Sequence, residues 1–385
     1  MLKKILIILG ILGVFFLCFV YIGQNKHQDN STVIQFASWG SKSEVDILKP
    51  LLDEFEVENP DIRVDLMHIP QNYFQKIHLL FASNTAPDVI FINNHYLPIY
   101  ANAGLLEPLQ ADNNFYKKSL EALSWGNTLY AVPRDISNLV IFYNKDIFDR
   151  YGVKYPQENW TFSDFLKTAK SLTRDGIFGI SFEEDTLFYL PYLMSEGGGI
   201  LADDLSRLII DDSSSKKGLN FYADLRKKYH VAPLREESAS ATMAQMFLQG
   251  KLAMQLSGRW LVPKYREEAD FDWDVVNFPH GSKGSVVPLD ASGWAIAKSS
   301  KHKPEARKLV DFLASKRSIE KFAASGLIVP AREDVAESIY FLDNKKPLHT
   351  RVFLDVIKTS KPTPVSVDYK EILDNLKGRF EYLFN

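Results

Sequence analysis

Carboxylates beside predicted loops are the residues of this chain that could carry chemistry. Asp135, Glu196 and Asp290 lie next to loop segments, and Glu183-Glu184-Asp185 forms a short acidic run. Two carboxylates that flank a glycosidic bond can hydrolyse it as an acid paired with a base or a nucleophile. The acidic run is more typical of a solvated loop. Because the sequence does not say whether two of these groups face one bond, a glycoside-active enzyme stays open as an alternative.

The other familiar signatures of catalysis and cofactor binding do not occur in the sequence. There is no P-loop, no G-x-G-x-x-G and no G-x-S-x-G, and Gly197-Gly198-Gly199 lacks the lysine of a phosphate-binding loop. The histidines show no H-E-x-x-H or other close metal-ligand spacing. The single cysteine, Cys18, leaves the body without a thiol nucleophile or a disulfide. We therefore expect a protein that is not an enzyme and uses no cofactor or metal ion.

Length and charge limit the remaining classes of protein. A chain of 385 residues exceeds what one compact core usually covers, so two lobes are expected. The formal net charge is -3 and no block of basic residues is present, which argues against a nucleic-acid partner.

The N-terminus is typical of an export signal or membrane anchor. Lys3 and Lys4 precede an uncharged apolar run over residues 5–22, and a polar stretch to residue 32 follows as a tether. Small residues for signal-peptide cleavage are poorly placed, and Leu17 makes Cys18 a poor lipidation site. An uncleaved anchor fits best, although a lipoprotein and a cleaved periplasmic form stay open. In each case the body lies outside the cytoplasm.

Five predicted elements follow in the order strand, helix, strand, helix, strand, over residues 33–37, 45–55, 62–66, 73–81 and 89–92. This order predicts a parallel sheet with helices on both faces. Such sheets bind ligands beyond the carboxyl ends of their strands. Those ends carry Ser38-Trp39-Gly40 and Asn93-Asn94-His95.

The rest of the chain repeats this alternation more loosely. Strands are predicted over 139–143, 176–180 and 252–256, and helices over 162–172, 219–229, 239–248, 304–313 and 318–324. The tail over 369–383 is amphipathic, which is typical of a terminal helix docked on the protein.

Several segments, taken in order, resemble one protein family. The chain is similar to the extracellular solute-binding proteins of family 1, the carbohydrate-type binding subunits of ABC importers, a group that includes maltose-binding protein. The resemblance covers residues 33–335 and lies in segments 87–90, 100–109, 129–135, 141–148, 197–201, 246–260, 292–296 and 326–332. The most specific blocks are Leu129-Tyr130-Ala131-Val132-Pro133-Arg134-Asp135 and Ile141-Phe142-Tyr143-Asn144-Lys145-Asp146-Ile147-Phe148.

The resemblance implies an α/β fold of two lobes, the type II periplasmic-binding-protein fold, with the ligand cleft between them. Chain crossings are expected near 133–137, 288–292 and 330–333. One lobe would comprise residues 33–136 and 292–331, and the other residues 137–291 and 332–385. The implied function is capture of a mono- or oligosaccharide by lobe closure and its delivery to an ABC permease, which a separate ATPase subunit drives.

A sugar offers hydroxyl groups and apolar ring faces, so it is bound by flat aromatic rings and fixed polar groups. With the resemblance as a guide, such residues are sought at strand ends and crossings. The candidates are Trp39, Glu44, Asn93, His95, Asp135, Arg259, Trp260, Asp290, Trp294 and Arg332. Arginines at 134, 259 and 332 leave an anionic ligand, such as a sugar phosphate or uronate, open as an alternative.

Overall fold

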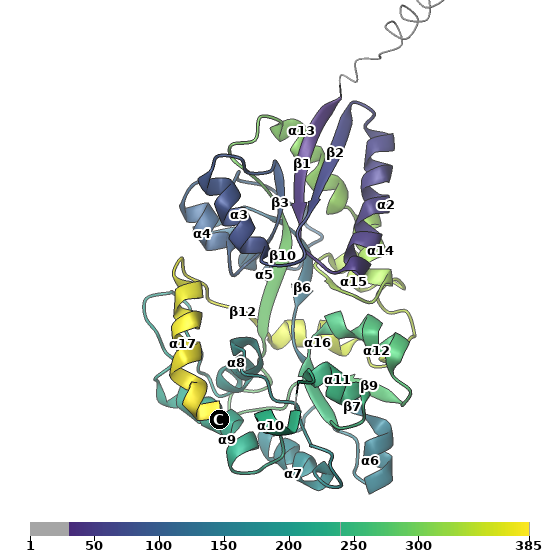
Figure 1. Ribbon diagram of the computed structural model, residues 1–385, viewed down its shortest axis with the longest axis vertical. Coiled ribbons are helices and arrows are strands. Elements are labelled where there is room, and N and C mark those ends of the chain that lie inside the picture. Colours follow the sequence, from purple (N-terminus) through teal and green to yellow (C-terminus); the bar gives the residue numbers. More distant parts are fainter. Residues whose placement is uncertain (1–30, 239, 385) are drawn as a thin grey trace, which may run out of the picture.

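A computed structural model describes residues 31–238 and 240–384. The predicted export segment, including Cys18, lies outside these residues apart from its last two positions. Within the described part of the chain, no helix combines the length and apolarity needed to cross a bilayer. The described residues form an α/β structure of two lobes, one above the other in Figure 1.

The upper lobe is built on the predicted alternation of strands and helices. Strand β1 pairs in parallel with β2 on one side and β3 on the other. The apolar positions of α2, Val45, Leu48, Leu51, Leu52 and Phe55, are buried, as the sequence predicts. The elements of this lobe are β1 (Thr32–Ser38), α2 (Lys42–Glu58), β2 (Ile62–His68), α3 (Tyr73–Ala82), β3 (Val89–Asn93), α4 (Leu97–Asn102), α5 (Lys117–Ala122), β4 (Ser124–Trp125), β5 (Thr128–Leu129), α13 (Lys303–Leu313) and α14 (Lys316–Ala324).

The lower lobe has a smaller sheet in which β7 pairs antiparallel with β8 and β9. Helices surround this sheet (Figure 1). Its elements are β7 (Val140–Asn144), α6 (Lys145–Tyr151), α7 (Phe162–Leu172), α8 (Thr186–Ser195), α9 (Ser213–Lys227), α10 (Arg235–Ser238), α11 (Met243–Leu248), β8 (Met254–Ser257), the 3-10 turn η1 (Arg259–Leu261), α12 (Val262–Glu268) and β9 (Trp273–Val276).

The predicted crossings coincide with neighbouring strands. Strand β10 (Pro288–Ile296) pairs antiparallel with β3 of the upper sheet and with β6 (Val132–Ser137), and β6 also pairs with β11 (Val329–Pro330). A further short strand, β12 (Lys361–Pro362), pairs in parallel with the start of β10. The sequence did not predict this last pairing. The link between the lobes is therefore a set of hydrogen-bonded strands.

Three sequence predictions differ from the structure. The predicted strand over 176–180 is wrong, because those residues make only isolated bridges beside Leu252 and Arg174. Helix α9 begins at Ser213, six residues before the predicted start. Its first five residues are Ser and Lys, so the sequence shows no apolar periodicity there. Helix α11 begins at Met243, four residues after the predicted start.

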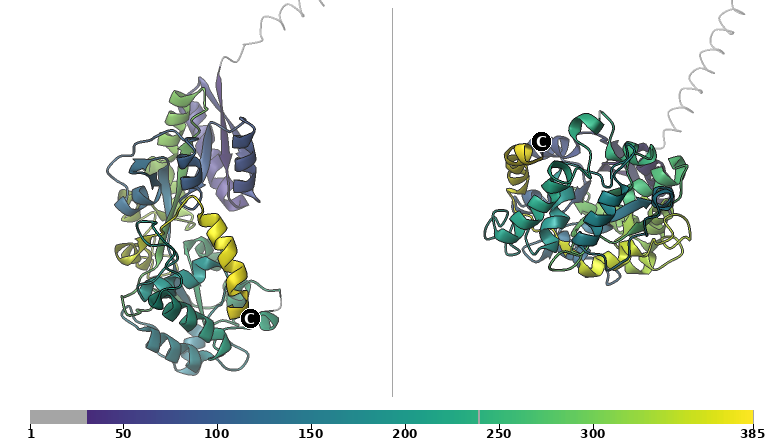
Figure 2. Two further views of the ribbon diagram at one scale, coloured as in Figure 1. Left: turned by 90° about the vertical axis from the view of Figure 1, so that its left-hand side faces the viewer. Right: turned by 90° about the horizontal axis from the view of Figure 1, so that it is seen from below.

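The C-terminal segment contains α15 (Glu333–Ala336), α16 (Val352–Thr359) and α17 (Tyr369–Phe384). Helix α17 buries Leu376, Phe380 and Phe384, and the rings of Phe380 and Phe384 lie 6.1 and 5.5 Å from that of Tyr189 on α8. Figure 2 shows the helix running along the lower lobe, with its first turn toward the upper one. The predicted docking of the tail is confirmed.

Gly293 on β10 gives the first test of the fold. A Cβ at this position would lie 2.1 Å from the backbone oxygen of Val132 on β6, which cannot move without separating two crossing strands. We expect Gly293→Ala to lower the free energy of unfolding by about 1–3 kcal/mol, measured by urea denaturation. The control is Gly378→Ala on α17, which meets nothing within 4 Å. It should raise that free energy by up to about 1 kcal/mol. Equal stability of Gly293→Ala and the parent chain would contradict the close strand approach.

Candidate functional site

A cavity of about 570 Å³ opens where the two lobes meet. The upper lobe and its crossing strands supply one side, and the segments before α8 and after β8 supply the other. The structure brings most of the predicted ligand residues together here. They are Trp39, Glu44, Asn93, His95, Asp135, Arg259, Trp260 and Asp290. Their roles toward a ligand stay predictions.

Two tryptophans from opposite lobes border the cavity. Trp39 follows β1 and is 45% exposed, whereas Trp260 lies in η1 after β8 and is 36% exposed. Large aromatic rings are usually buried, so two exposed indoles at one cavity are informative. Gly258 is required beside Trp260, because a Cβ at position 258 would lie 1.9 Å from the indole ring. The backbone is thus shaped to let this ring lie against it.

A buried ion cluster forms the floor of the upper side. The guanidinium of Arg134 pairs with the carboxylate of Glu44, and its Nη2 lies 3.1 Å from Oδ2 of Asp135. The other carboxylate oxygen of Asp135 accepts a hydrogen bond from the hydroxyl of Ser292 on β10. Burial opposes the charge of Arg134, but the two carboxylates outweigh it and raise the pKa of Arg134. The cluster holds these polar groups in fixed positions.

A second polar group lies where β3 ends beside β10. Nε2 of His95 lies 2.9 Å from Oδ1 of Asp290, which also accepts a 2.8 Å hydrogen bond from the side chain of Asn94. Burial opposes both charges, but the attraction between them raises the pKa of His95 and lowers the pKa of Asp290. The imidazole also meets the ring of Tyr369 edge-on at 5.4 Å. The start of α17 is thus in contact with the edge of the cavity.

Arg259 differs from Arg134 in having no hydrogen-bond acceptor for its guanidinium among the described residues. Its side chain is almost fully buried and lies 4.1 Å from the ring centre of Phe341 and 5.4 Å from that of Phe353. Burial, helped by the nearby charge of Arg266, lowers the pKa of Arg259 to about 9. Aromatic faces replace the usual carboxylate partner here.

Two predicted ligand residues do not lie at this cavity, and the prediction is corrected for both. Trp294 is 1% exposed and packs near Phe322, because β10 passes into the covered upper sheet after a register shift between Ser292 and Gly293. Arg332 is buried against Phe115 and forms ion pairs with the carboxylates of its surroundings, Asp112 at 2.9 Å and Asp334 at 3.0 Å.

Sequence reasoning also missed residues that line the cavity, notably Asp185 and Leu187. Asp185 begins α8, and its carboxylate accepts a 2.9 Å hydrogen bond from the backbone N–H of Leu187. The acidic run was a visible signal, but only the packing of α8 brings its last member to the cavity. Arg134, which the sequence suggested only as a contact for an anionic ligand, also lines it.

Two of the carboxylates that suggested glycoside hydrolysis, Asp135 and Asp290, line the cavity, and each is paired with a basic side chain. Glu196 does not line the cavity and instead pairs at 2.6 Å with Lys217 and with the hydroxyl of Ser282. A general acid needs a raised pKa, whereas the pKa of Asp290 is lowered by His95. No group of three possible ligands among residues 31–238 and 240–384 is arranged to hold a metal ion.

Comparisons with known proteins agree on one family. The model of the family described as bacterial extracellular solute-binding protein matches residues 40–320. The chain is 26% identical to a putative binding protein of Brucella abortus (strain 2308), over 86% of this chain and 82% of that protein. It is 23% identical to the galactooligosaccharide-binding protein of Bacillus subtilis (strain 168), over 87% of this chain and 80% of that protein.

A solved structure shows the same fold. The ABC substrate-binding protein from Listeria monocytogenes in complex with cycloalternan superposes with a TM-score of 0.85 at 26% identity. The match covers 92% of this chain and 94% of that chain.

The two buried arginines at the cavity give opposite predictions for stability. Arg134→Met should lower the free energy of unfolding by about 3–5 kcal/mol, because it leaves the carboxylates of Glu44 and Asp135 buried without their partner. Arg259→Met should raise it by about 1–3 kcal/mol, because it removes a buried charge that no acceptor compensates. Denaturant titration of both variants measures the difference. A large loss of stability in Arg259→Met would contradict the unpaired state of that guanidinium.

Glu183 gives a pH-dependent prediction. Burial, with a smaller effect of the Asp185 charge, raises the pKa of Glu183 to about 7. A carboxyl group whose pKa is raised in the folded state stabilises the fold at pH values below its ordinary pKa. For Glu183 this stabilisation is lost as the pH rises through about 7, its pKa in the folded protein. Compared with the parent chain, Glu183→Gln should therefore gain about 1–3 kcal/mol of stability between pH 5 and pH 8.

Glu54→Gln serves as a control of opposite sign. Hydrogen bonding and charge from Lys321 and Arg317 lower the pKa of Glu54. The ionised carboxylate of Glu54 therefore stabilises the fold at pH values above its ordinary pKa, and this stabilisation is lost as the pH falls. Glu54→Gln should be less stable than the parent chain at pH 8, and the difference should shrink toward pH 3. Denaturation curves that shift equally with pH in both variants would contradict the assignment for Glu183.

Proposed function

Because the chain belongs to the bacterial extracellular solute-binding protein family, we propose that it captures a carbohydrate between its lobes and delivers it to an ABC permease. The observation that carries this proposal is the pair of exposed indoles, Trp39 and Trp260, on opposite sides of one cavity. Flat aromatic surfaces suit the apolar faces of sugar rings. Asn93, Asp135 and Asp290 supply polar groups for hydroxyls beside them.

The polar groups of the cavity favour a neutral sugar over an anionic one. The charge of Arg134 is already met by Glu44 and Asp135, and Arg332 lies elsewhere with its own partners. The nitrogens of Arg259 are covered by protein atoms. A phosphate or carboxylate would therefore find no free guanidinium at the cavity surface.

Ligand capture would proceed by a hinge motion about the crossing strands. We assign residues 33–136 and 292–331 to one lobe and residues 137–291 and 332–385 to the other, with the strand pairing of β6, β10, β11 and β12 as the link. Closure would bring the two indoles toward the same ligand and exclude water from the polar groups. We propose binding without chemical conversion of the sugar.

The N-terminal sequence and the family support a proposal for where in the cell the protein acts. We propose that residues 1–32 export the chain and tether it to the membrane, by a retained anchor or by lipidation at Cys18. The body would then act outside the cytoplasm and present its closed form to permease subunits, which a separate ATPase powers.

A thermal-shift screen tests the proposed function. A ligand that binds only the folded protein raises its melting temperature by mass action. The panel should contain neutral mono- and oligosaccharides, with uronates and sugar phosphates as the anionic arm. We expect stabilisation by neutral sugars and recovery of the same sugar unchanged after incubation. Shifts with the anionic arm alone, or a chemically altered sugar, would contradict the proposal.

The indoles give the prediction for binding. Trp39→Ala and Trp260→Ala should each weaken binding of the best sugar from the screen by about tenfold or more, because each removes one stacking surface. Isothermal titration calorimetry measures the affinity. Tyr382→Ala removes an aromatic ring that is 71% exposed but distant in the chain from the cavity residues, and it should leave the affinity unchanged. Unchanged affinity in both tryptophan variants would exclude stacking at this cavity.

A further inference from the structure

A second cavity, of about 670 Å³, adjoins the first on the side of α17. The two cavities share four lining residues, His95 and Asp290 from the upper side and Asp185 and Leu187 from the lower side. They are therefore two parts of one continuous cleft. Each part alone falls in the range of about 300–1,000 Å³ that is usual for a complete small-molecule site.

Helix α17 forms a wall of the second cavity. Lys370, Asp374 and Lys377 line it, and their spacing of four and three residues places them on one face of the helix. The adjacent face carries Leu376 and Phe380, which are buried against the lower lobe. The helix thus has one face for packing and one that borders the cleft.

The helix is held firmly on the lower lobe. Besides the ring contacts with Tyr189, Nη1 of Arg226 on α9 donates a 2.8 Å hydrogen bond to the backbone oxygen of Phe384. The first residue of the helix, Tyr369, reaches the imidazole of His95 in the upper lobe. The wall therefore moves with one lobe and meets the other at the point where the two cavities join.

The charges around the second cavity are mostly paired with each other. Glu184 pairs with Arg235, and Lys370 pairs with Asp374. Such a surface offers many hydrogen-bond donors and acceptors without a strong net charge. It suits a chain of hydroxyl groups better than a phosphate or a carboxylate.

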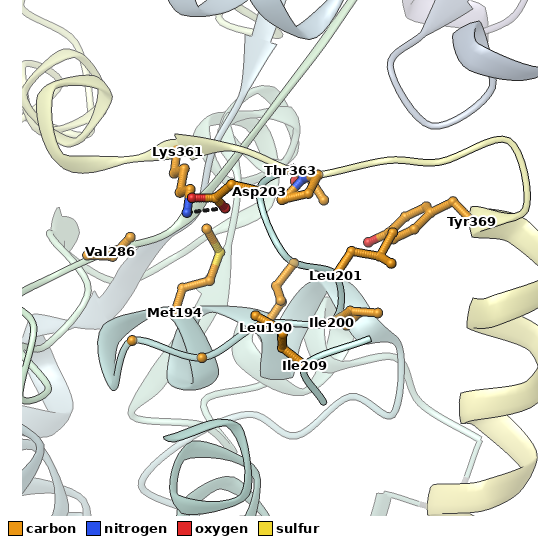
Figure 3. A pocket seen from close by; sticks show the side chains of 14 residues that line it. Leu190, Met194, Ile200, Leu201, Asp203, Ile209, Val286, Lys361, Thr363 and Tyr369 are labelled. Carbon is orange, nitrogen blue, oxygen red and sulfur yellow. Dashed lines mark ion pairs between the residues drawn. The ribbon is translucent and has the colours of Figure 1, made fainter. Parts of the chain in front are cut away.

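Tyr369 and Leu190 line both the second cavity and a third one. The third cavity has a volume of about 350 Å³, and its wall also includes Met194 and Ile209 (Figure 3). Figure 3 also shows the ion pair of Lys361 and Asp203 at its edge. The two larger cavities together run from the two indoles to α17.

We infer that α17 is part of the ligand site, and that the ligand is a neutral oligosaccharide longer than a disaccharide, with its far end against Lys370 and Lys377. The inference rests on the proposed function and adds the length of the sugar and a third wall of the site. Rings near Trp39 and Trp260 would occupy the first cavity. The following rings would pass His95 and Asp185 into the second.

Titration with sugars of graded length tests this inference. The probes are the series from maltose to maltohexaose and galactooligosaccharides of matched lengths, titrated calorimetrically into the full chain. In the series that binds, affinity should rise beyond the disaccharide. The double variant Lys370→Ala/Lys377→Ala should weaken the longer sugars about 5- to 20-fold and leave the disaccharide unchanged. Equal affinity for all lengths, or equal weakening of all lengths, would overturn the inference.

A matched control lies on the same helix. Glu371 and Asn375 are exposed residues of α17 that do not line the cavity. Glu371→Ala/Asn375→Ala should leave the affinity for every length unchanged. A loss of long-sugar affinity in this control as well would mean that helix stability, not contact with the sugar, is being measured, and would count against the inference.

A second measurement reports directly on whether the sugar reaches α17. Cys18 is the only cysteine, so Lys377→Cys in a Cys18→Ser background allows labelling with an environment-sensitive fluorophore at one site. The longer sugars should change its emission, and the disaccharide should not. No response to any length that binds would overturn the inference while leaving the proposed function intact. Absence of saturable binding by any sugar in either series or in the wider screen would refute the proposed function, and the inference with it.

Discussion

The buried ion cluster around Arg134 is the interaction on which the rest of the site depends. It joins the start of α2, through Glu44, to strand β6, through Asp135, and Ser292 extends it to β10. A buried charge that loses its partner costs several kcal/mol, so these three elements can hardly separate without unfolding. The turn that carries Trp39 depends on the cluster too, because a Cβ at Gly40 would lie 2.3 Å from Oε2 of Glu44. The position of the first indole is thus tied to the ion cluster.

The cluster also explains the chemistry that the cleft can offer. Arg134 pairs with Glu44 and Asp135, and His95 pairs with Asp290. The strongest charges of the upper side therefore neutralise one another. What the cleft presents is a set of fixed polar groups between two exposed aromatic rings. This arrangement discriminates by shape and hydrogen bonding rather than by charge, which suits a polyhydroxylated neutral ligand. The pairing with His95 also lowers the pKa of Asp290, whereas a general acid needs a raised pKa.

Much of the fold could be predicted from the sequence because the apolar periods of β1, α2, β2, α3 and β3 are clear and local. The crossings were located through resemblance, and the structure has strands at all three of them. Trp294 was misplaced because its side of β10 depends on a register shift beside Gly293, which sequence alternation does not reveal. Asp185 was missed because an acidic run is normally a solvated loop, and only the packing of α8 brings it to the cleft.

Helix α17 shows why sequence pattern predicts docking better than function. Its apolar face, with Leu376 and Phe380, indicates that it packs on something, and it does pack on the lower lobe. The pattern of its other face, with Lys370 and Lys377, is that of any solvated helix. Which surface that face borders is decided by distant residues, such as the aromatic rings of α8 and α9 that receive the helix. The helix is docked on the lower lobe, while Tyr369 meets His95 in the upper lobe. The proposed hinge closure would therefore change the width of the cleft at α17 as well as between the indoles.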